Sequence, residues 1–255
     1  MNIVEFMNVR PKIGITMRLE IETRRFYLGR DYSEAVEAAG GDPVHIGLIP
    51  KREYISSVLA GLDGILLPGS DTDVDPHLYG EEPHPNLKRV VPEKDETDRL
   101  VIEEAEKLGL PILAICYGMQ ALNVSRGGSL IQDIESQIEN AIQHEQGVPL
   151  ARGSHKLTFS DHWVVAEHAC EASASVRVNS HHHQAIGRVG DGLEAVAYAT
   201  DGIVESIQDV REGRFILGVQ WHPELSWHID PLSRGLFDEF VSRCRSGAFR
   251  AVGEA

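Results

Sequence analysis

The sequence has few cysteines, no long apolar run and a shortage of basic residues, and each absence excludes a class of protein. Its three cysteines are odd in number and scattered among 255 residues, which argues against a disulfide framework and fits a reducing compartment. No apolar run approaches the roughly 20 residues of a membrane-spanning helix. Residues 1–10 also lack the apolar core of a signal peptide. We therefore expect a cytoplasmic protein that does not enter a membrane.

The charge is strongly acidic. Lys and Arg number 24 against 39 Asp and Glu, which gives a formal net charge of −15. Nucleic acids and anionic membranes both require a positive face on the protein, so we expect neither as a partner. The length and the ordinary 42% hydrophobic content fit one globular unit. We expect a single domain over residues 1–255, with a core over about residues 11–246.

The pattern of apolar residues predicts strands that alternate with helices. In the first half we expect strands at residues 12–16, 43–49, 64–67 and 112–115, and helices at residues 27–39, 52–60 and 94–108. This alternation is typical of an open, mostly parallel sheet with helices on both faces. In the second half we expect an antiparallel extension of the sheet, with strands at residues 155–159, 163–165, 175–179, 193–198, 203–209 and 215–219. A closing helix should run from Pro231 to about Cys244, followed by a frayed tail from Gly247. The polar stretch at residues 131–168 predicts a flap beside the site.

A candidate nucleophile follows the strand at residues 112–115. The strand stops at Cys116, Gly118 comes two positions later, and a helical pattern follows. A strand, a reactive residue, a tight turn and a helix form the nucleophile-elbow arrangement. The positive end of the helix favours the thiolate over the thiol, and the N–H of Tyr117 would lie close to a developing oxyanion. The alternative is a buried, inert cysteine at a strand end.

A candidate base follows another predicted strand. The strand at residues 215–221 ends in His222-Pro223-Glu224, where the proline fixes the backbone. Glu224 would orient the imidazole and stabilise its protonated form as Cys116 loses its proton. The alternative for Glu224 is a solvated surface carboxylate.

Five separated motifs, in order, give a family resemblance. They comprise residues 114–120 (AICYGMQ) with 218–224 (GVQWHPE), residues 67–70 (LPGS) with 75–80, residues 123–133, residues 178–184 and residues 201–207. Together they resemble the class I glutamine amidotransferases, and more narrowly the γ-glutamyl-γ-aminobutyrate hydrolase-like branch, peptidase C26. The resemblance implies a flavodoxin-like α/β fold, a triad of Cys116, His222 and Glu224, and hydrolysis of a γ-glutamyl amide through a thioester, without a cofactor.

The same resemblance extends to residues around the triad. It assigns a second oxyanion donor to Gly69, although a plain turn glycine is the alternative. It implies that a small γ-glutamyl substrate contacts the Gln120 side chain, the backbone groups of Ser180 and His181, and His183. The leaving amine stays open between γ-aminobutyrate, a polyamine derivative such as one from putrescine catabolism, and another amine.

No metal site is expected. On an extended segment His181 and His183 share one face while His182 opposes them, and no cysteine or acidic motif completes a zinc set. The acidic loop from Asp71 resembles a calcium loop in its spacing, but Pro76 stands where a glycine is needed.

Two departures from the family pattern leave alternatives open. Ala114 replaces a glycine, and Tyr117 stands where hydrolases of this branch often carry arginine. Because tyrosine there is typical of amidotransferases coupled to a synthetase, a glutaminase subunit that delivers ammonia to a synthetase is a second, less favoured hypothesis. An inactive binding protein of the same fold is a third. The oligomeric state stays open, with a homodimer as one alternative.

Overall fold

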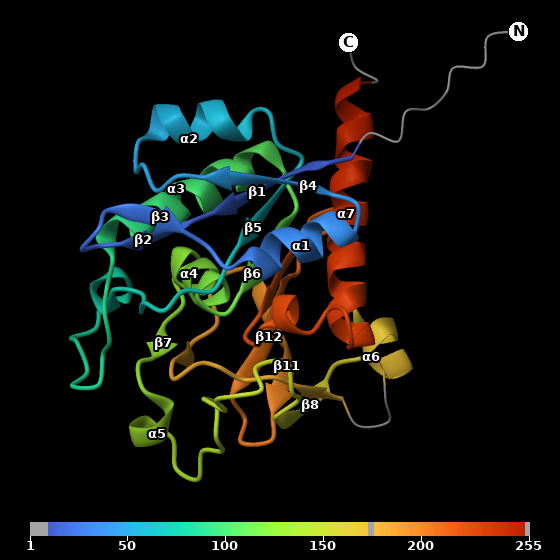
Figure 1. The fold of residues 1–255 in the computed structure, drawn as a ribbon. Helices are drawn as coiled ribbons and strands as arrows, with labels where there is room; N and C mark the ends of the chain where they lie inside the picture. The colour runs from blue at the N-terminus through green and yellow to red at the C-terminus, as the bar shows by residue number, and fades with distance from the viewer. Residues whose placement is uncertain (1–9, 173–175, 253–255) are drawn as a thin grey trace, which may run out of the picture.

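The computed structural model describes residues 10–172 and 176–252 (Figure 1). Its centre is a nine-stranded sheet. Along the sheet the strands are ordered β4 (Asp42–Ile46), β1 (Lys12–Thr16), β5 (Gly64–Leu67), β6 (Ile112–Ile115), β13 (Ile216–Val219), β12 (Val204–Asp209), β11 (Leu193–Ala199), β8 (His155–Phe159) and β9 (Arg177–Val178). The first five are parallel, and each of the last four runs antiparallel to its neighbour. This is the expected flavodoxin-like sheet with an antiparallel extension.

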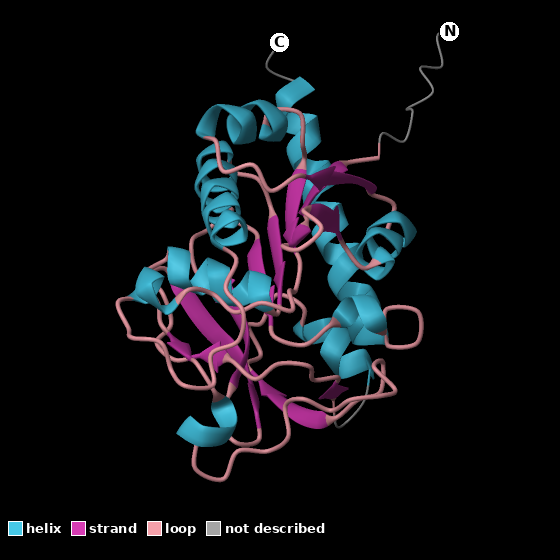
Figure 2. Cartoon of the chain, turned by 60° about the vertical axis from the view of Figure 1, so that its left-hand side comes forward, coloured by secondary structure: helices cyan, strands magenta, loops and turns pink. Residues whose placement is uncertain are grey.

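Helices cover both faces of the sheet (Figure 2). The main helices are α1 (Arg30–Ala38), α2 (Arg52–Leu59), α3 (Pro92–Leu108), α4 (Tyr117–Ser125) and α7 (Pro231–Val252). Shorter elements are α5 (Ile134–Gln137), α6 (Ala166–Ala172) and two 3-10 turns, η1 (Pro76–Tyr79) and η2 (Pro223–Leu225). Two small antiparallel sheets complete the fold: the hairpin of β2 (Arg18–Glu20) and β3 (Arg25–Tyr27), and β7 (Leu130–Ile131) with β10 (Ala185–Ile186), which are distant in the sequence.

Alternating side chains of the central strands divide the core into two layers, because successive residues of a strand face opposite ways. In β6, Leu113 and Ile115 pack in one cluster with α1 and α7. Ile112 and Ala114 pack in the other with α2, α3 and α4. All four side chains are fully buried, so the strand that precedes Cys116 is held rigidly from both sides.

Several expected boundaries are wrong. The first helix begins at Arg30, not at Tyr27, because Tyr27 pairs with Arg18 in the small β2–β3 sheet and Gly29 is extended at the N-cap. The strand expected to run to Ile49 ends at Ile46. The last helix continues past Gly247 to Val252. Ser175, the expected start of the strand that forms as β9, lies outside the described residues.

The strand expected at residues 163–165 does not form. Trp163 and Val165 are buried while Val164 is 37% exposed, so the burial alternates as in a strand. The backbone bonds locally instead: Trp163 N–H donates to Ser160 O and Ala166 N–H to Trp163 O. The segment is therefore a turn that leads into α6. The region predicted as a flap also contributes β8 to the main sheet.

Candidate active site

Cys116 occupies a strained turn between β6 and α4. Its backbone has φ 51° and ψ −109°, a region that L-residues rarely adopt and that costs energy. The surrounding structure holds it there: Cys116 N–H donates to Val219 O on the neighbouring strand, at 2.8 Å. Gly118 makes the turn possible, because a Cβ at that position would lie 2.2 Å from Leu67 O. The Cys116 side chain therefore projects from the C-terminal end of the parallel sheet.

His222 follows β13 at the same edge of the sheet. Its Nδ1 lies 2.6 Å from Glu224 Oε1, and both side chains are buried. The side-chain amide of Asn179 makes two hydrogen bonds with the backbone of His222. His222 N–H donates to Asn179 Oδ1, and Asn179 Nδ2 donates to His222 O, each at 2.8 Å. The imidazole is thus oriented by Glu224 and anchored by Asn179.

The structure brings Cys116 and His222 together, although they are far apart in the sequence. Both line one cavity, and a Cβ placed on Gly69 would lie 2.7 Å from His222 Cε1 and 3.4 Å from Cys116 Cβ. Burial alone would lower the pKa of His222, but the charges of Glu224 and Cys116, with side-chain hydrogen bonds to both, raise this pKa to about 10. The imidazole is therefore held in its protonated form between the Glu224 carboxylate and the Cys116 sulfur.

Gly69 lies where the resemblance expects it, but its N–H is already engaged. It donates to the hydroxyl of Tyr32, on α1, at 3.0 Å. Burial and the Glu224 carboxylate raise the pKa of Tyr32 well above its ordinary value, so the phenol stays neutral. Arg18 reaches the same place, with its Nε donating to Gly69 O at 2.7 Å. Tyr32 and Arg18 are functional candidates that the sequence motifs did not indicate.

The Tyr117 side chain turns away from the cavity. Its hydroxyl bonds Asp95 on α3, and the Lys94 ammonium lies 4.7 Å from the centre of its ring. Burial raises the pKa of Asp95 to about 6, although its bond with Tyr117 opposes the rise. The Tyr117 N–H belongs to the first turn of α4, where N–H groups have no acceptor within the helix. The tyrosine that departs from the family pattern thus presents its backbone, not its phenol, to the nucleophile.

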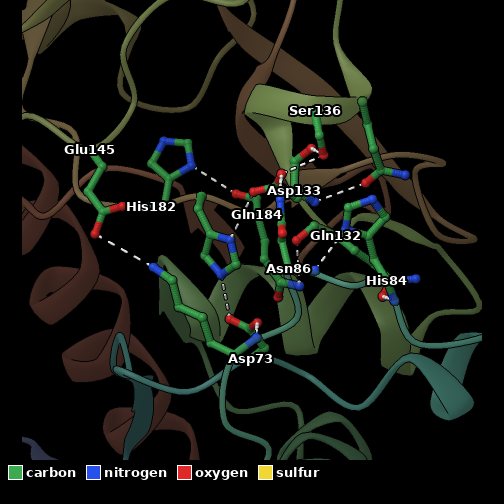
Figure 3. Close-up of polar contacts among 12 residues, drawn as sticks. Asp73, His84, Asn86, Gln132, Asp133, Ser136, Glu145, His182 and Gln184 are labelled. Carbon is green, nitrogen blue, oxygen red and sulfur yellow. Dashed lines mark hydrogen bonds and ion pairs between the residues drawn. The ribbon is translucent and has the colours of Figure 1, made fainter.

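The cavity beside Cys116 measures about 310 Å³ and adjoins a larger one of about 780 Å³. Most of the residues that line each cavity are polar, and four of them line both: Lys88, Glu145, His182 and His183. His183 Nε2 lies 2.8 Å from Asp73 Oδ1, and Lys88 Nζ lies 3.6 Å from Glu145 Oε1 (Figure 3). The lining therefore suits a small, charged or strongly polar molecule.

Three of the four residues expected to contact the substrate line the smaller cavity, and Ser180 does not. Gln120, His181 and His183 line the smaller cavity. Ser180 is fully buried and is not among the lining residues. Its N–H donates to the Gln146 side chain, its carbonyl accepts from Gln146 N–H, and its hydroxyl donates to His144 O. The structure therefore gives Ser180 a place in the wall behind the cavity.

The fold is shared with a solved structure. A Thermoplasma acidophilum protein named as a candidate GMP synthase subunit superposes with a TM-score of 0.66, over 97% of this chain and 99% of that chain, at 19% identity. This likeness shows that the two chains share the same open α/β fold.

Sequence comparison gives the family. The model of the family described as peptidase C26 matches residues 11–224. The chain is 34% identical over 216 residues to protein NtpR of Enterococcus hirae, covering 84% of this chain and 88% of that one. It is also 34% identical over 247 residues to the γ-glutamyl-γ-aminobutyrate hydrolase PuuD of Escherichia coli, covering 92% and 94%. The chain belongs to the peptidase C26 family and is a hydrolase.

The described residues also bear on membrane association. Across residues 10–172 and 176–252, we find no helix with both the length and the apolar character needed to cross a bilayer.

Proposed function

We propose that this chain, acting as one domain, hydrolyses a γ-glutamyl amide through a thioester on Cys116. The observation that carries the proposal is that Cys116, on its strained turn, lies in the same cavity as His222. The Nδ1 atom of His222 lies 2.6 Å from the buried Glu224 carboxylate. A sulfur, an imidazole and an orienting carboxylate are the three groups that nucleophilic acyl transfer requires.

The first half-reaction forms the thioester. The Cys116 thiolate attacks the side-chain amide carbon of the substrate, and the amide oxygen becomes an oxyanion. His222 gives its proton to the nitrogen, the C–N bond breaks, and the amine leaves. The second half-reaction reverses the roles. His222 takes a proton from water, and the hydroxide attacks the thioester carbon. The C–S bond then breaks, glutamate leaves as the free acid and loses its proton to the solvent, and the Cys116 thiolate and the protonated His222 are restored.

We assign the oxyanion chiefly to the Tyr117 N–H. Gly69 N–H is the second donor, and it becomes available when the carbonyl oxygen of the substrate displaces the Tyr32 hydroxyl that it now bonds. In this scheme the Tyr32 hydroxyl accepts the hydrogen bond of Gly69 N–H in the free enzyme, before the substrate binds.

The α-carboxylate and the α-ammonium group of a γ-glutamyl substrate require a positive and a negative group on the protein. Arg18 and Lys88 are the arginine and the lysine that line the smaller cavity, and they suit the α-carboxylate. Asp73 and Glu145 line the same cavity and suit the α-ammonium group. The names of the relatives and this lining support a glutamyl substrate with a polar leaving amine, as in γ-glutamyl-γ-aminobutyrate.

The test is a panel of γ-glutamyl amides scored by glutamate release. We expect turnover of at least one amide by the wild type, and a loss of about 10⁴-fold or more in Cys116→Ala. Activity of that variant within about tenfold of wild type would rule the scheme out. Release of ammonia from glutamine only after a synthetase is added would favour a glutaminase subunit.

A further inference from the structure

A second group of ionisable side chains is buried beside the cavity, separate from Cys116, His222 and Glu224. It consists of His144, His155, His182 and Glu205, whose exposed fractions are 4%, 5%, 5% and 0%. One carboxylate oxygen, Glu205 Oε1, lies 3.0 Å from His155 Nε2, 3.5 Å from His144 Nδ1 and 3.6 Å from His182 Nε2. Three imidazole nitrogens therefore surround one oxygen in the interior.

In His144 and His182, the ring nitrogen that faces away from Glu205 already makes a hydrogen bond. His144 Nε2 lies 2.9 Å from Asp201 Oδ2, and His182 Nδ1 lies 2.8 Å from Gln184 O, a bond drawn in Figure 3. A carboxylate and a carbonyl accept hydrogen bonds, so each of these ring nitrogens carries the proton. In a neutral imidazole the other nitrogen then carries a lone pair. In their neutral forms both rings would therefore turn a lone pair toward Glu205.

The inner atoms make no hydrogen bond of acceptable geometry. Among the described residues, the buried atoms without a partner include both oxygens of Glu205, both ring nitrogens of His155 and His182 Nε2. The Ser180 hydroxyl lies 3.4 Å from His144 Nδ1, but it donates to His144 O at 2.8 Å. A buried carboxylate that faces nitrogen lone pairs is costly unless a positive charge lies among them.

We propose that His144, His155, His182 and Glu205 bind one divalent transition-metal ion, with zinc as the preferred ion. Three imidazoles and one carboxylate are a ligand set that suits zinc, whereas calcium and magnesium prefer oxygen ligands. Asp201 and Gln184 take the part that carboxylates and carbonyls usually take behind metal-bound histidines, where they fix the ring orientation.

The distances are close to those of such a site. Ligand atoms of a tetrahedral zinc ion bound at about 2.0–2.1 Å are separated by roughly 3.3 Å. The three separations from Glu205 Oε1, at 3.0, 3.5 and 3.6 Å, lie around that value. The ligand atoms of His144, His155 and Glu205 all fall within 4.8 Å of one another. Binding then requires the imidazoles to move inward by up to about an ångström.

The ion would join four separate segments. His144 lies in the irregular stretch before β8, His155 begins β8, His182 lies between β9 and β10, and Glu205 lies in β12. His181 and His183, the neighbours of His182, line the cavity next to Cys116. Four protein ligands leave no open position for a substrate, so the role is structural. The ion fixes the cavity wall and takes no part in the chemistry of Cys116.

Metal content tests the proposal without an activity assay. The full chain, purified without a polyhistidine tag, is stripped with a chelator, mixed with excess Zn²⁺, freed of unbound metal and analysed by mass spectrometry. We expect about one ion per chain, and with Co²⁺ the intense visible absorption of a tetrahedral complex. Glu205→Gln and His155→Gln should each lose the ion. His181→Gln, which alters the histidine run outside the cluster, should keep it.

Two results would overturn the proposal. One is wild-type protein that retains far less than one ion per chain and whose melting temperature is the same with zinc and with chelator. Protons alone would then neutralise the cluster. The other is one ion per chain in wild type, Glu205→Gln and His155→Gln alike, which would place the ion elsewhere. If the variants do not fold, wild-type metal content, cobalt spectrum and zinc-dependent melting decide the question, because an ion that binds only the folded chain must stabilise it.

Discussion

At the scale of single residues, the proposed chemistry depends on how His222 is held. Glu224 bonds its ring and Asn179 bonds its backbone from both sides. A general acid must lie within hydrogen-bonding distance of the leaving nitrogen, so a small displacement of the imidazole lowers the reaction rate strongly. Asn179 is therefore a positioning residue, which acts on the reaction through His222.

Replacing Asn179 by alanine leaves the N–H of His222 buried without a partner, while the C=O of His222 keeps the bond from Leu225 N–H at 3.2 Å. We expect a loss of about 1–3 kcal/mol in the free energy of unfolding for this one unpaired N–H. We also expect a fall in kcat of about 10- to 100-fold. Urea denaturation and steady-state kinetics measure the two effects, with Gln143→Ala, at an exposed amide, as the control. An unchanged kcat in a folded Asn179→Ala variant would contradict the positioning role.

The protonation of His222 gives a pH prediction. Its pKa in the folded protein is raised to about 10, above the value near 6.5 of an unperturbed histidine. The stabilisation from this ion pair is therefore fully present below about pH 6.5 and is lost as the pH rises through about 10. NMR titration of the ring should show the imidazolium at neutral pH, and Glu224→Gln should lower the midpoint. A midpoint near 6.5 in the wild type would contradict the arrangement.

The sequence predicts some of these residues and not others, for a physical reason. Cys116, His222 and Glu224 each follow a strongly apolar strand, so a local pattern marks them. Asn179 meets His222 across 43 residues, and Tyr32 meets Gly69 across 37. The contacts exist only after the sheet has formed. The cluster around Glu205 is hidden in the same way, because its ligands come from four elements.

At the scale of elements, the elbow between β6 and α4 is the critical feature. The helix can begin directly after Cys116 because Gly118 allows it to approach β5 closely. By contrast, the alternation at residues 163–165 predicts a strand where a turn forms. There the side-chain pattern satisfies burial, but the backbone bonds to its own neighbours, and a period-two pattern alone does not reveal this.

Gly118→Ala should distort the elbow. The new Cβ would meet the Leu67 carbonyl oxygen at 2.2 Å, which is backbone and cannot rotate away. We expect a loss of at least about 1–3 kcal/mol in the free energy of unfolding, together with reduced reactivity of Cys116. Gly61→Ala is the matched control, since only Val58 O lies near, at 3.9 Å, and it should stay within about 0.5 kcal/mol. Equal stability of the two variants would show that the close approach is unimportant.

At the scale of the whole molecule, the cavity lies where the parallel and antiparallel parts of the sheet meet. The parallel part carries Cys116 and Gly69, and the adjoining strand β13 leads to His222. The antiparallel part and its connections supply His181, His183 and the cluster around Glu205. The proposed chemistry thus lies on the parallel half of the sheet. The cavity wall opposite it comes from the half that differs from a simple flavodoxin-like sheet.

The most direct test of the central claim is where an electrophilic analogue of glutamine, a chloromethyl ketone, attaches to the protein. The chain offers its own controls, because Cys170 is exposed and Cys244 is fully buried. We predict about one label per chain, mapped by peptide mass spectrometry to Cys116 although its side chain is only 5% exposed. Labelling of Cys170 while Cys116 stays unmodified would contradict the account.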